Sequence, residues 1–175
     1  MSMGDKILGQ PRERLLIKDY IAERYLGEHV ILGCPLGPVP EVIIATYGYR
    51  QALRVARGIR PEVDALVIKA PNLILIEAKI FKWLDGLSKL PVYASLIPTT
   101  YELEQYRDYN IVMRLVTPWI NETIETAAAN LGVKVEIFSP PWIADYVDKM
   151  HHYWTSEYRH ERDEKVRLRK LFGLE

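Results

Sequence analysis

The sequence predicts an α/β fold with a mixed central β-sheet flanked by helices. Short aliphatic and β-branched runs alternate along the chain with helix-like segments, which is typical of α/β layer architectures. In two neighbouring runs the apolar residues occupy both strand faces, as in strands that are covered on both sides. With 175 residues, 49% of them hydrophobic, the chain can form one domain with a substantial core. We expect the core in residues 1–140 and a C-terminal helical extension of the same domain in residues 141–175.

Strands are predicted where a short apolar run is bounded by turn residues such as Gly, Pro and Asn. These runs cover residues 29–33, 41–47, 63–69, 73–80, 110–117 and 133–138. The segment 34–40 contains three prolines. We predict a loop there, because proline cannot donate a hydrogen bond to a central strand.

Helices are predicted where apolar residues recur at helical spacing between start and stop signals. They cover residues 11–27, 49–56, 99–109 and 122–131, and a charge-rich helical pattern runs through 142–171. Pro11 suits the first position of its helix and Gly27 suits the stop. Thr99 and Glu102 have the spacing of a capping box. For residues 49–56 the apolar spacing favours a helix over a strand.

The two central runs are predicted to form a β-hairpin around Ala70-Pro71-Asn72. Proline presets φ, and asparagine tolerates turn geometry. If the hairpin is centred between Ala70 and Pro71, Asp64 stands opposite Glu77. Lys79 then projects on the same face as Glu77, because side chains alternate along a strand.

Opposed residues of a sheet have Cβ atoms roughly 4.5–5.5 Å apart. Two carboxylates at that spacing repel unless a cation lies between them or one of them is protonated. Hard cations such as Mg²⁺ bind carboxylate oxygens together with waters and phosphate oxygens. Asp64 and Glu77 with the neighbouring Lys79 therefore predict a site for phosphodiester cleavage with Mg²⁺ or Mn²⁺.

The pattern Asp64-x12-Glu77-Ala78-Lys79 resembles the signature of the PD-(D/E)XK nuclease superfamily, and the resemblance covers about residues 11–138. Val63 precedes Asp64, so the proline–aspartate pair of the signature is absent. The resemblance implies a restriction-endonuclease-like three-layer core and metal-dependent hydrolysis of DNA. It implies Asp64, Glu77 and the carbonyl of Ala78 as metal ligands, and Lys79 as the group that orients the attacking water.

Two further features resemble those of RecB-like and Holliday-junction-resolvase-like members of the superfamily. Gln105 and Tyr109 have a spacing similar to the Q-x-x-x-Y motif, whose residues line the DNA side of the site. Many members also carry an acidic residue on the first helix that reaches the metal. Here Glu23 is the preferred candidate and Glu13 the second.

Basic residues flank the acidic hairpin on both sides. Arg50, Arg54, Arg57 and Arg60 precede it, and Lys82 follows it. We predict that they contact a phosphate backbone. The alternative is a solvated surface with balanced charge, and the sequence favours neither for the arginines.

Composition limits the possible partners and cellular location of the protein. The formal net charge is zero, so overall charge does not indicate nucleic acid as the partner. The single cysteine, Cys34, cannot form an intramolecular disulfide and is expected in the core. No signal peptide is recognisable, and no apolar run approaches the ~18 residues of a membrane span. We expect a cytoplasmic protein with DNA as partner, and a single site per chain is consistent with a homodimer.

Two other functions stay open from the sequence. One is a module of the same fold that binds DNA or supports an assembly without catalysis. The zero net charge favours this reading, and the complete set of motif residues disfavours it. The other is a structural protein in which Asp64, Glu77 and Lys79 form an ion-pair cluster, although such a buried cluster contributes little net stability.

Overall fold

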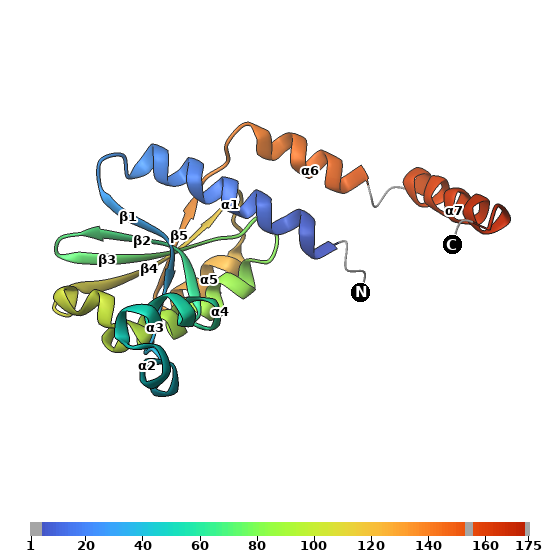
Figure 1. The fold of residues 1–175 in the computed structure, drawn as a ribbon. Helices are drawn as coiled ribbons and strands as arrows, with labels where there is room; N and C mark the ends of the chain where they lie inside the picture. The colour runs from blue at the N-terminus through green and yellow to red at the C-terminus, as the bar shows by residue number, and fades with distance from the viewer. Residues whose placement is uncertain (1–4, 153–155, 174–175) are drawn as a thin grey trace. The chain divides into compact units, whose positions relative to one another are not determined.

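The computed structural model describes residues 5–152 and 156–173 and has an α/β fold built on a five-stranded mixed sheet (Figure 1). The chain divides into two compact units, Met1–Phe138 and Ser139–Glu175. The first unit contains the sheet, and the second contains the helices α6 (Trp142–His152) and α7 (Ser156–Leu171). None of the helices in the described residues has the length and apolar character that crossing a bilayer requires. The predicted α/β class is confirmed.

Five of the predicted strands form the sheet, in the order β1-β2-β3-β4-β5. They are β1 (His29–Pro35), β2 (Glu62–Lys69), β3 (Asn72–Ala78), β4 (Asn110–Thr117) and β5 (Val133–Ile137). The first three pair antiparallel, whereas β4 runs parallel to both β3 and β5. Parallel neighbours need a crossover connection, and each crossover here contains a helix that covers the sheet.

The predicted hairpin and its register are confirmed. β2 and β3 are joined through Ala70 and Pro71, whose peptide bond is cis. Ala65 pairs with Ile76, and Lys69 pairs with Asn72. Continuing this register by one residue puts Asp64 opposite Glu77, at the open end of the hairpin.

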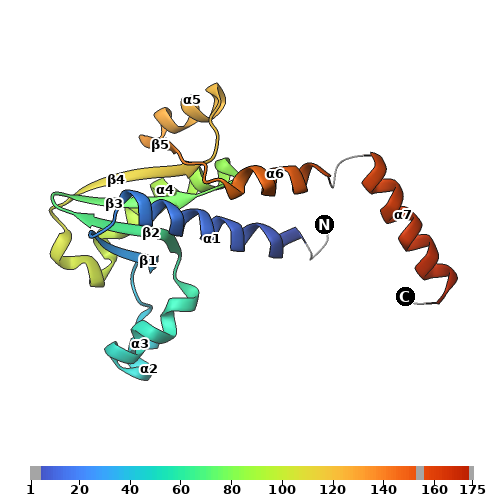
Figure 2. The same ribbon diagram turned by 90° about the horizontal axis from the view of Figure 1, so that it is seen from above.

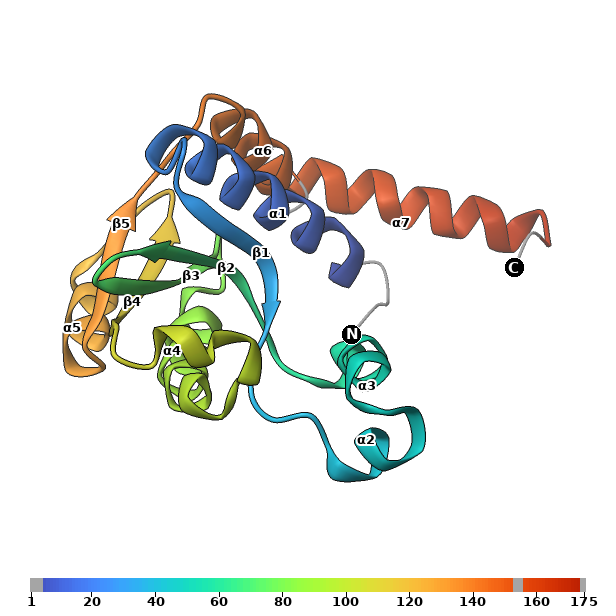
Figure 3. The same cartoon turned by 60° about the vertical axis from the view of Figure 1, so that its left-hand side comes forward.

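Helices cover both faces of the sheet and complete three layers (Figures 1 and 3). α1 (Asp5–Arg24) lies on one face, where Leu16 and Tyr20 are fully buried. α4 (Trp83–Leu96) and α5 (Glu122–Asn130) lie on the other. Their apolar residues pack with those of β2, β3 and β4 in one core cluster. Cys34 is buried in the same cluster, as predicted.

The first helix differs from its prediction at both ends. It spans Asp5–Arg24, so Pro11 lies inside it and the prediction of Pro11 as the first helical residue is wrong. Proline lacks an N–H group, so the helix loses one main-chain hydrogen bond there but continues on both sides. Gly27, the predicted stop, adopts φ 86° just after the helix.

Residues 41–47 form a helix, so the predicted strand is wrong. α2 (Glu41–Tyr47) begins after Pro40, ends at Gly48 with φ 72°, and buries none of its residues. The strand prediction rested on the apolar run in this segment, but the carbonyl of Pro40 accepts from the main-chain N–H groups of Ile43 and Ile44, which begins a helical turn. α3 (Tyr49–Ala56) has the predicted bounds. Figure 2 shows α2 and α3 as an arm that projects away from the sheet.

The predicted helix over residues 99–109 is also wrong. The segment forms two 3-10 helices, η2 (Ile97–Thr99) and η3 (Tyr101–Tyr106). Thr99 does not cap a helix, because its hydroxyl donates to the carbonyl of Leu96 at 2.9 Å. The hydroxyl of Thr100 donates to the same carbonyl and accepts from the main-chain N–H of Gly37. These bonds tie the segment to the loop after β1 and replace the expected capping box.

Candidate active site

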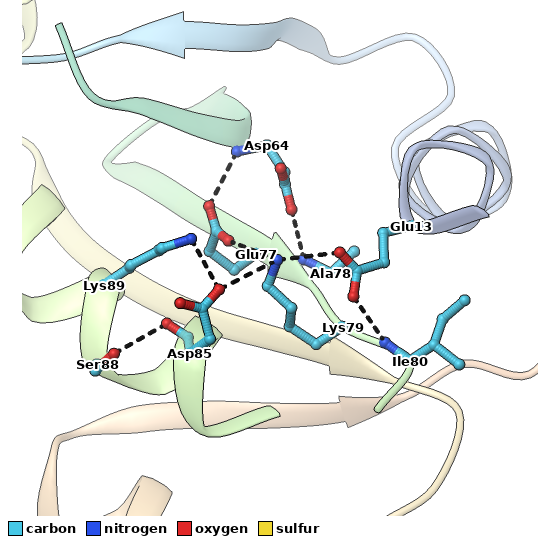
Figure 4. A network of polar contacts seen from close by, with 9 residues as sticks. All are labelled: Glu13, Asp64, Glu77, Ala78, Lys79, Ile80, Asp85, Ser88 and Lys89. Carbon is cyan, nitrogen blue, oxygen red and sulfur yellow. Dashed lines mark hydrogen bonds and ion pairs between the residues drawn. The ribbon is translucent and has the colours of Figure 1, made fainter. Parts of the chain in front are cut away.

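The predicted carboxylates and lysine of the hairpin line a cavity of about 160 Å³ at the C-terminal end of β3. Its walls come from α1, β2, β3 and α4. The lining residues are Glu13, Arg14, Glu62, Asp64, Glu77, Lys79, Lys89 and Tyr93. Figure 4 shows the polar contacts among several of these residues. The fold thus brings residues from four separate segments to one small polar site.

The hairpin backbone holds Asp64 and Glu77 against each other (Figure 4). The main-chain N–H of Asp64 donates to Oε1 of Glu77 at 3.3 Å. The main-chain N–H of Ala78 donates to Oδ2 of Asp64 at 2.9 Å. Because both donors belong to paired strands, the two carboxylates keep a fixed relation to each other. This is the juxtaposition that the hairpin register predicted.

Glu77 is an acid in an unfavourable environment for its charge. Its side chain is 2% exposed. Burial, followed by the negative charge of Asp64, raises the pKa of Glu77 from 4.5 to about 8, although Lys79 and Lys89 act in the opposite direction. At neutral pH the carboxyl group therefore retains a proton that a bound cation could displace.

Lys79 lies just beyond β3, where its main-chain N–H donates to the carbonyl of Val116 on β4. Its Nζ is 3.2 Å from Oε2 of Glu13, 3.7 Å from Oδ2 of Asp85 and 3.8 Å from Oε2 of Glu77. Burial alone lowers the pKa of an ammonium group, but the surrounding carboxylates raise the pKa of Lys79 overall. The ammonium therefore stays charged inside the cavity.

Glu13, and not Glu23, is the acid of the first helix that reaches the site. Glu13 Oε2 contacts Lys79, and its Oε1 accepts from the main-chain N–H of Ile80 at 3.4 Å. The preference for Glu23 is contradicted, because that side chain is 60% exposed and pairs with Arg24 at 3.5 Å. Ten residues along α1 separate the two acids by roughly 15 Å, so only one of them can lie beside the end of β3.

Gln105 and Tyr109 are not brought to the cavity, which corrects their predicted placement. Gln105 is an exposed residue of η3, and Tyr109 packs beside Tyr106 after that helix ends. The next residue, Asn110, donates to the carbonyl of Pro71 at the turn of the hairpin. The turn lies roughly 17 Å along β3 from Glu77, at about 3.3 Å per residue. The two residues also share no face, because the segment is not α-helical.

Lys89 and Tyr93, which have the same four-residue spacing, lie at the cavity instead. Asp85, Lys89 and Tyr93 follow one another at intervals of four along α4, so they form one stripe of that helix. Lys89 and Tyr93 line the cavity, and Lys89 Nζ is 2.8 Å from Asp85 Oδ2. Burial, and then the charges of Glu77 and Asp64, raise the pKa of Tyr93 to about 12. This stripe was not predicted from the sequence, although its four-residue spacing is a recognisable helical signal.

Gly86 allows α4 to approach the site closely. A Cβ atom at this position would lie 2.9 Å from Cγ of Lys79, 2.8 Å from Cδ1 of Leu115 and 3.6 Å from Cβ of Glu77. Such distances are shorter than normal carbon contacts. The absence of a side chain at Gly86 is therefore what lets the helix pack directly over the two site residues.

The predicted basic contacts divide into two groups. Arg60 is buried, and its guanidinium forms paired contacts of 2.6 and 3.0 Å with Glu102, which contradicts a role on an exposed DNA surface. Arg57 donates to the carbonyl of Gly33 and lies 3.6 Å from Glu62. The other three are exposed, and the described residues provide none of them with a charged partner: Arg50, Arg54 and Lys82.

The donor set at the cavity suits a hard cation that keeps part of its shell for other ligands. Within residues 5–152 and 156–173, no group of three or more His, Cys, Asp or Glu side chains is arranged as a complete metal site. Asp64 and Glu77 supply two adjacent carboxylates. Mg²⁺ is commonly bound by one or two carboxylates, with waters and substrate phosphates completing the shell. The half-buried Asp64 and the buried Glu77 therefore fit such an ion.

Comparisons with known proteins give no match to any family model or to any curated protein sequence. Among solved structures, the chain is similar to a repair endonuclease from Pyrococcus abyssi, with a TM-score of 0.43 and 17% identity over 73% of this chain. It is also similar to a chain of the EndoMS–dsDNA2 complex, with a TM-score of 0.42 and 16% identity over 73% of this chain. The matches cover 47% and 44% of those two chains.

Proposed function

We propose that this protein is a metal-dependent nuclease that hydrolyses phosphodiester bonds in DNA. The observation that carries the proposal is the buried Glu77, held against Asp64 and beside the ammonium of Lys79 in a small open cavity. A buried pair of acids opposes folding unless protons, cations or hydrogen bonds compensate for it. Strongly shifted pKa values in a cavity are more typical of a site with a chemical role than of residues that only stabilise the fold.

Asp64 and Glu77 would hold Mg²⁺ or Mn²⁺, and the carbonyl of Ala78 is a further proposed ligand. The bound ion would polarise a phosphate oxygen and lower the pKa of a coordinated water. Glu13 is the acid of α1 nearest to this position, since it contacts Lys79 and Ile80. We therefore assign to Glu13 the supporting role that was first predicted for Glu23.

Lys79 would orient the attacking water and neutralise charge that develops on the phosphate. Its ammonium can donate three hydrogen bonds, and Glu13 and Asp85 hold it at the edge of the acid pair. Tyr93 keeps its phenolic proton at neutral pH, because its pKa is about 12. It can therefore donate a hydrogen bond to a phosphate or water in the cavity.

Exposed cations outside the cavity would contact DNA away from the reacting phosphate. Arg50 and Arg54 lie one helical turn apart on α3, and Lys82 precedes α4. All three are exposed. Their guanidinium and ammonium groups suit contacts with the phosphate backbone, which carry affinity and little sequence preference.

The test is a cleavage assay on the purified full chain with labelled duplex, single-stranded and branched DNA. We expect cleavage in Mg²⁺ or Mn²⁺ and none in EDTA. Cleavage that persists unchanged in EDTA would contradict the proposal. Binding of DNA without cleavage of any form would instead support the second reading, a DNA-binding module of the same fold without catalysis.

A further inference from the structure

Lys79 has little capacity left to bind a DNA phosphate outside the reaction itself. Three carboxylates lie within 4.0 Å of its Nζ, at 3.2, 3.7 and 3.8 Å. Its side chain is only 10% exposed. A DNA strand that crosses the mouth of the cavity therefore needs other cations to hold the phosphates on either side of the reacting one.

Lys89 is one such cation, on the α4 wall of the cavity. Its side chain is 42% exposed and lines the cavity. Among the described residues it forms one ion pair, with Asp85 on the preceding turn of the helix. Figure 4 shows Lys89 on the opposite side of the Glu77–Lys79 pair from Glu13. An exposed i,i+4 pair of this kind is weak, so a phosphate can compete for the ammonium.

Arg14 is the second, on the α1 wall. It follows Glu13, lines the cavity and is exposed. Nothing in the described part of the chain forms a hydrogen bond or ion pair with its guanidinium. Guanidinium groups bind phosphate oxygens with two parallel hydrogen bonds. Since α1 and α4 cover opposite faces of the sheet (Figure 1), Arg14 and Lys89 lie on opposite walls.

The size of the cavity limits what enters it. Its volume of about 160 Å³ equals about five waters at roughly 30 Å³ each. That space suits one phosphate group with its nearest sugar atoms. The neighbouring phosphates of the same strand must then lie at the rim, where the two cations are exposed.

We infer that Arg14 and Lys89 bind the phosphates that flank the reacting one and so position the cleaved strand across the cavity. This inference rests on the proposed nuclease function and adds two positioning residues to it. Neither residue is assigned a chemical step. Their removal should weaken DNA binding directly, whether or not cleavage occurs.

The experiment measures binding of a labelled DNA duplex and its single strand in EDTA, over a series of salt concentrations. We expect Arg14→Gln and Lys89→Met each to weaken binding about fivefold or more, and to lower the slope of log affinity against log salt by about 0.7–0.9. Lys134→Met is the matched control, because Lys134 is exposed on β5 and does not line the cavity. It should match the wild type. Lys89→Arg should retain most of the affinity.

A double-mutant cycle separates phosphate contact from a purely structural role of Lys89. If Lys89 only neutralises Asp85, Lys89→Met will have no effect in an Asp85→Asn background. If Lys89 binds phosphate, the loss of affinity will remain there. Unchanged affinity and salt slope in Arg14→Gln would overturn the inference, even if Lys89→Met fails to fold.

The outcomes also distinguish this inference from the proposed function. A wild type that cleaves DNA while both variants bind normally contradicts the inference alone. A wild type that binds DNA through Arg14 and Lys89 but never cleaves contradicts the nuclease proposal alone. A wild type that binds neither probe and cleaves no DNA in Mg²⁺ or Mn²⁺ contradicts both.

Discussion

The ammonium of Lys79 lies 3.2 Å from the carboxylate of Glu13, although 66 residues separate them in the chain. Lys79 follows the central strand β3, and Glu13 lies on the helix that covers one face of the sheet. The contact therefore depends on the tertiary fold. It makes Glu13 a residue that acts through Lys79, which distinguishes it from the acid pair itself.

Replacing Glu13 with Gln should reduce cleavage about tenfold or more, because Lys79 loses the negative charge that orients its ammonium group. DNA affinity in EDTA should stay close to that of the wild type. Glu23→Gln, a substitution on the same helix, should change neither quantity, because Glu23 is exposed and pairs only with Arg24 among the described charges. Single-turnover rates and fluorescence anisotropy measure the two effects. Equal rates for Glu13→Gln and Glu23→Gln would remove Glu13 from the site.

The raised pKa of Glu77 predicts how stability depends on pH in the metal-free protein. The folded state holds a proton up to about pH 8, whereas the ordinary value is 4.5. The contribution of this proton to the free energy of unfolding is complete below pH 4.5 and is lost as the pH rises through about 8. Thermal unfolding in EDTA should therefore show stability falling over this range, with a smaller fall in Glu77→Gln. At pH 8 the variant should be more stable by about 1–2 kcal/mol.

The same group couples metal binding to protonation. Below pH 8 an ion bound by Glu77 must displace its proton, so affinity should rise with pH up to about 8. Calorimetric titrations of Mn²⁺ in buffers with different ionisation enthalpies measure the protons released. Near neutral pH, binding of Mn²⁺ to the wild type should release a proton. This release should be absent in Glu77→Gln. A heat of binding independent of the buffer would show that Glu77 does not exchange a proton for the ion.

Gly86→Ala adds only one methyl group but should impair the site. The added Cβ would meet Lys79 at 2.9 Å and Leu115 at 2.8 Å. Overpacking costs about 1–3 kcal/mol, and the gain in helix propensity offsets roughly 1 kcal/mol. We expect a net loss of stability of up to about 2 kcal/mol and displacement of Lys79, seen as slower cleavage. Gly58→Ala is the control, because no atom lies within 4 Å of a Cβ built there.

Arg60 and Arg54 should behave oppositely when each is replaced with Ala. Arg60 is buried and paired with the more exposed Glu102, so its loss should destabilise the fold by about 1–3 kcal/mol. Arg54 is exposed and unpaired within the described residues, so its loss should leave stability unchanged and weaken DNA binding. Thermal unfolding and binding in EDTA separate the two. A stable Arg60→Ala protein with weakened DNA binding would reverse this assignment.

The sequence predicts well whatever depends on neighbours along the chain. The hairpin of β2 and β3 follows from strand alternation and one turn, so its register and the pairing of Asp64 with Glu77 are recoverable. The strand β4 likewise has the predicted bounds. Glu13 and Lys89 were harder to place, because their helices reach the site only through packing against opposite faces of the sheet.

The wrong predictions have a common physical origin in local patterns that tertiary context overrides. The apolar run in α2 suits a strand, but within the described residues it pairs with no strand and forms helical hydrogen bonds instead. Thr99 and Glu102 have capping-box spacing, yet Thr100 bonds to Gly37 and Glu102 bonds to Arg60. Gln105 and Tyr109 form a helical pair only if the segment is α-helical, and it is 3-10.

The most direct test of the central claim is the single-turnover rate of DNA cleavage in Mg²⁺ by the wild type and by Asp64→Asn. The substitution keeps the size of the side chain and removes the charge opposite Glu77. We predict metal-dependent cleavage by the wild type and a loss of about 10²-fold or more in the variant, with its fold and its DNA affinity in EDTA retained. Equal rates for the two proteins would contradict the assignment of this hairpin as the site of cleavage.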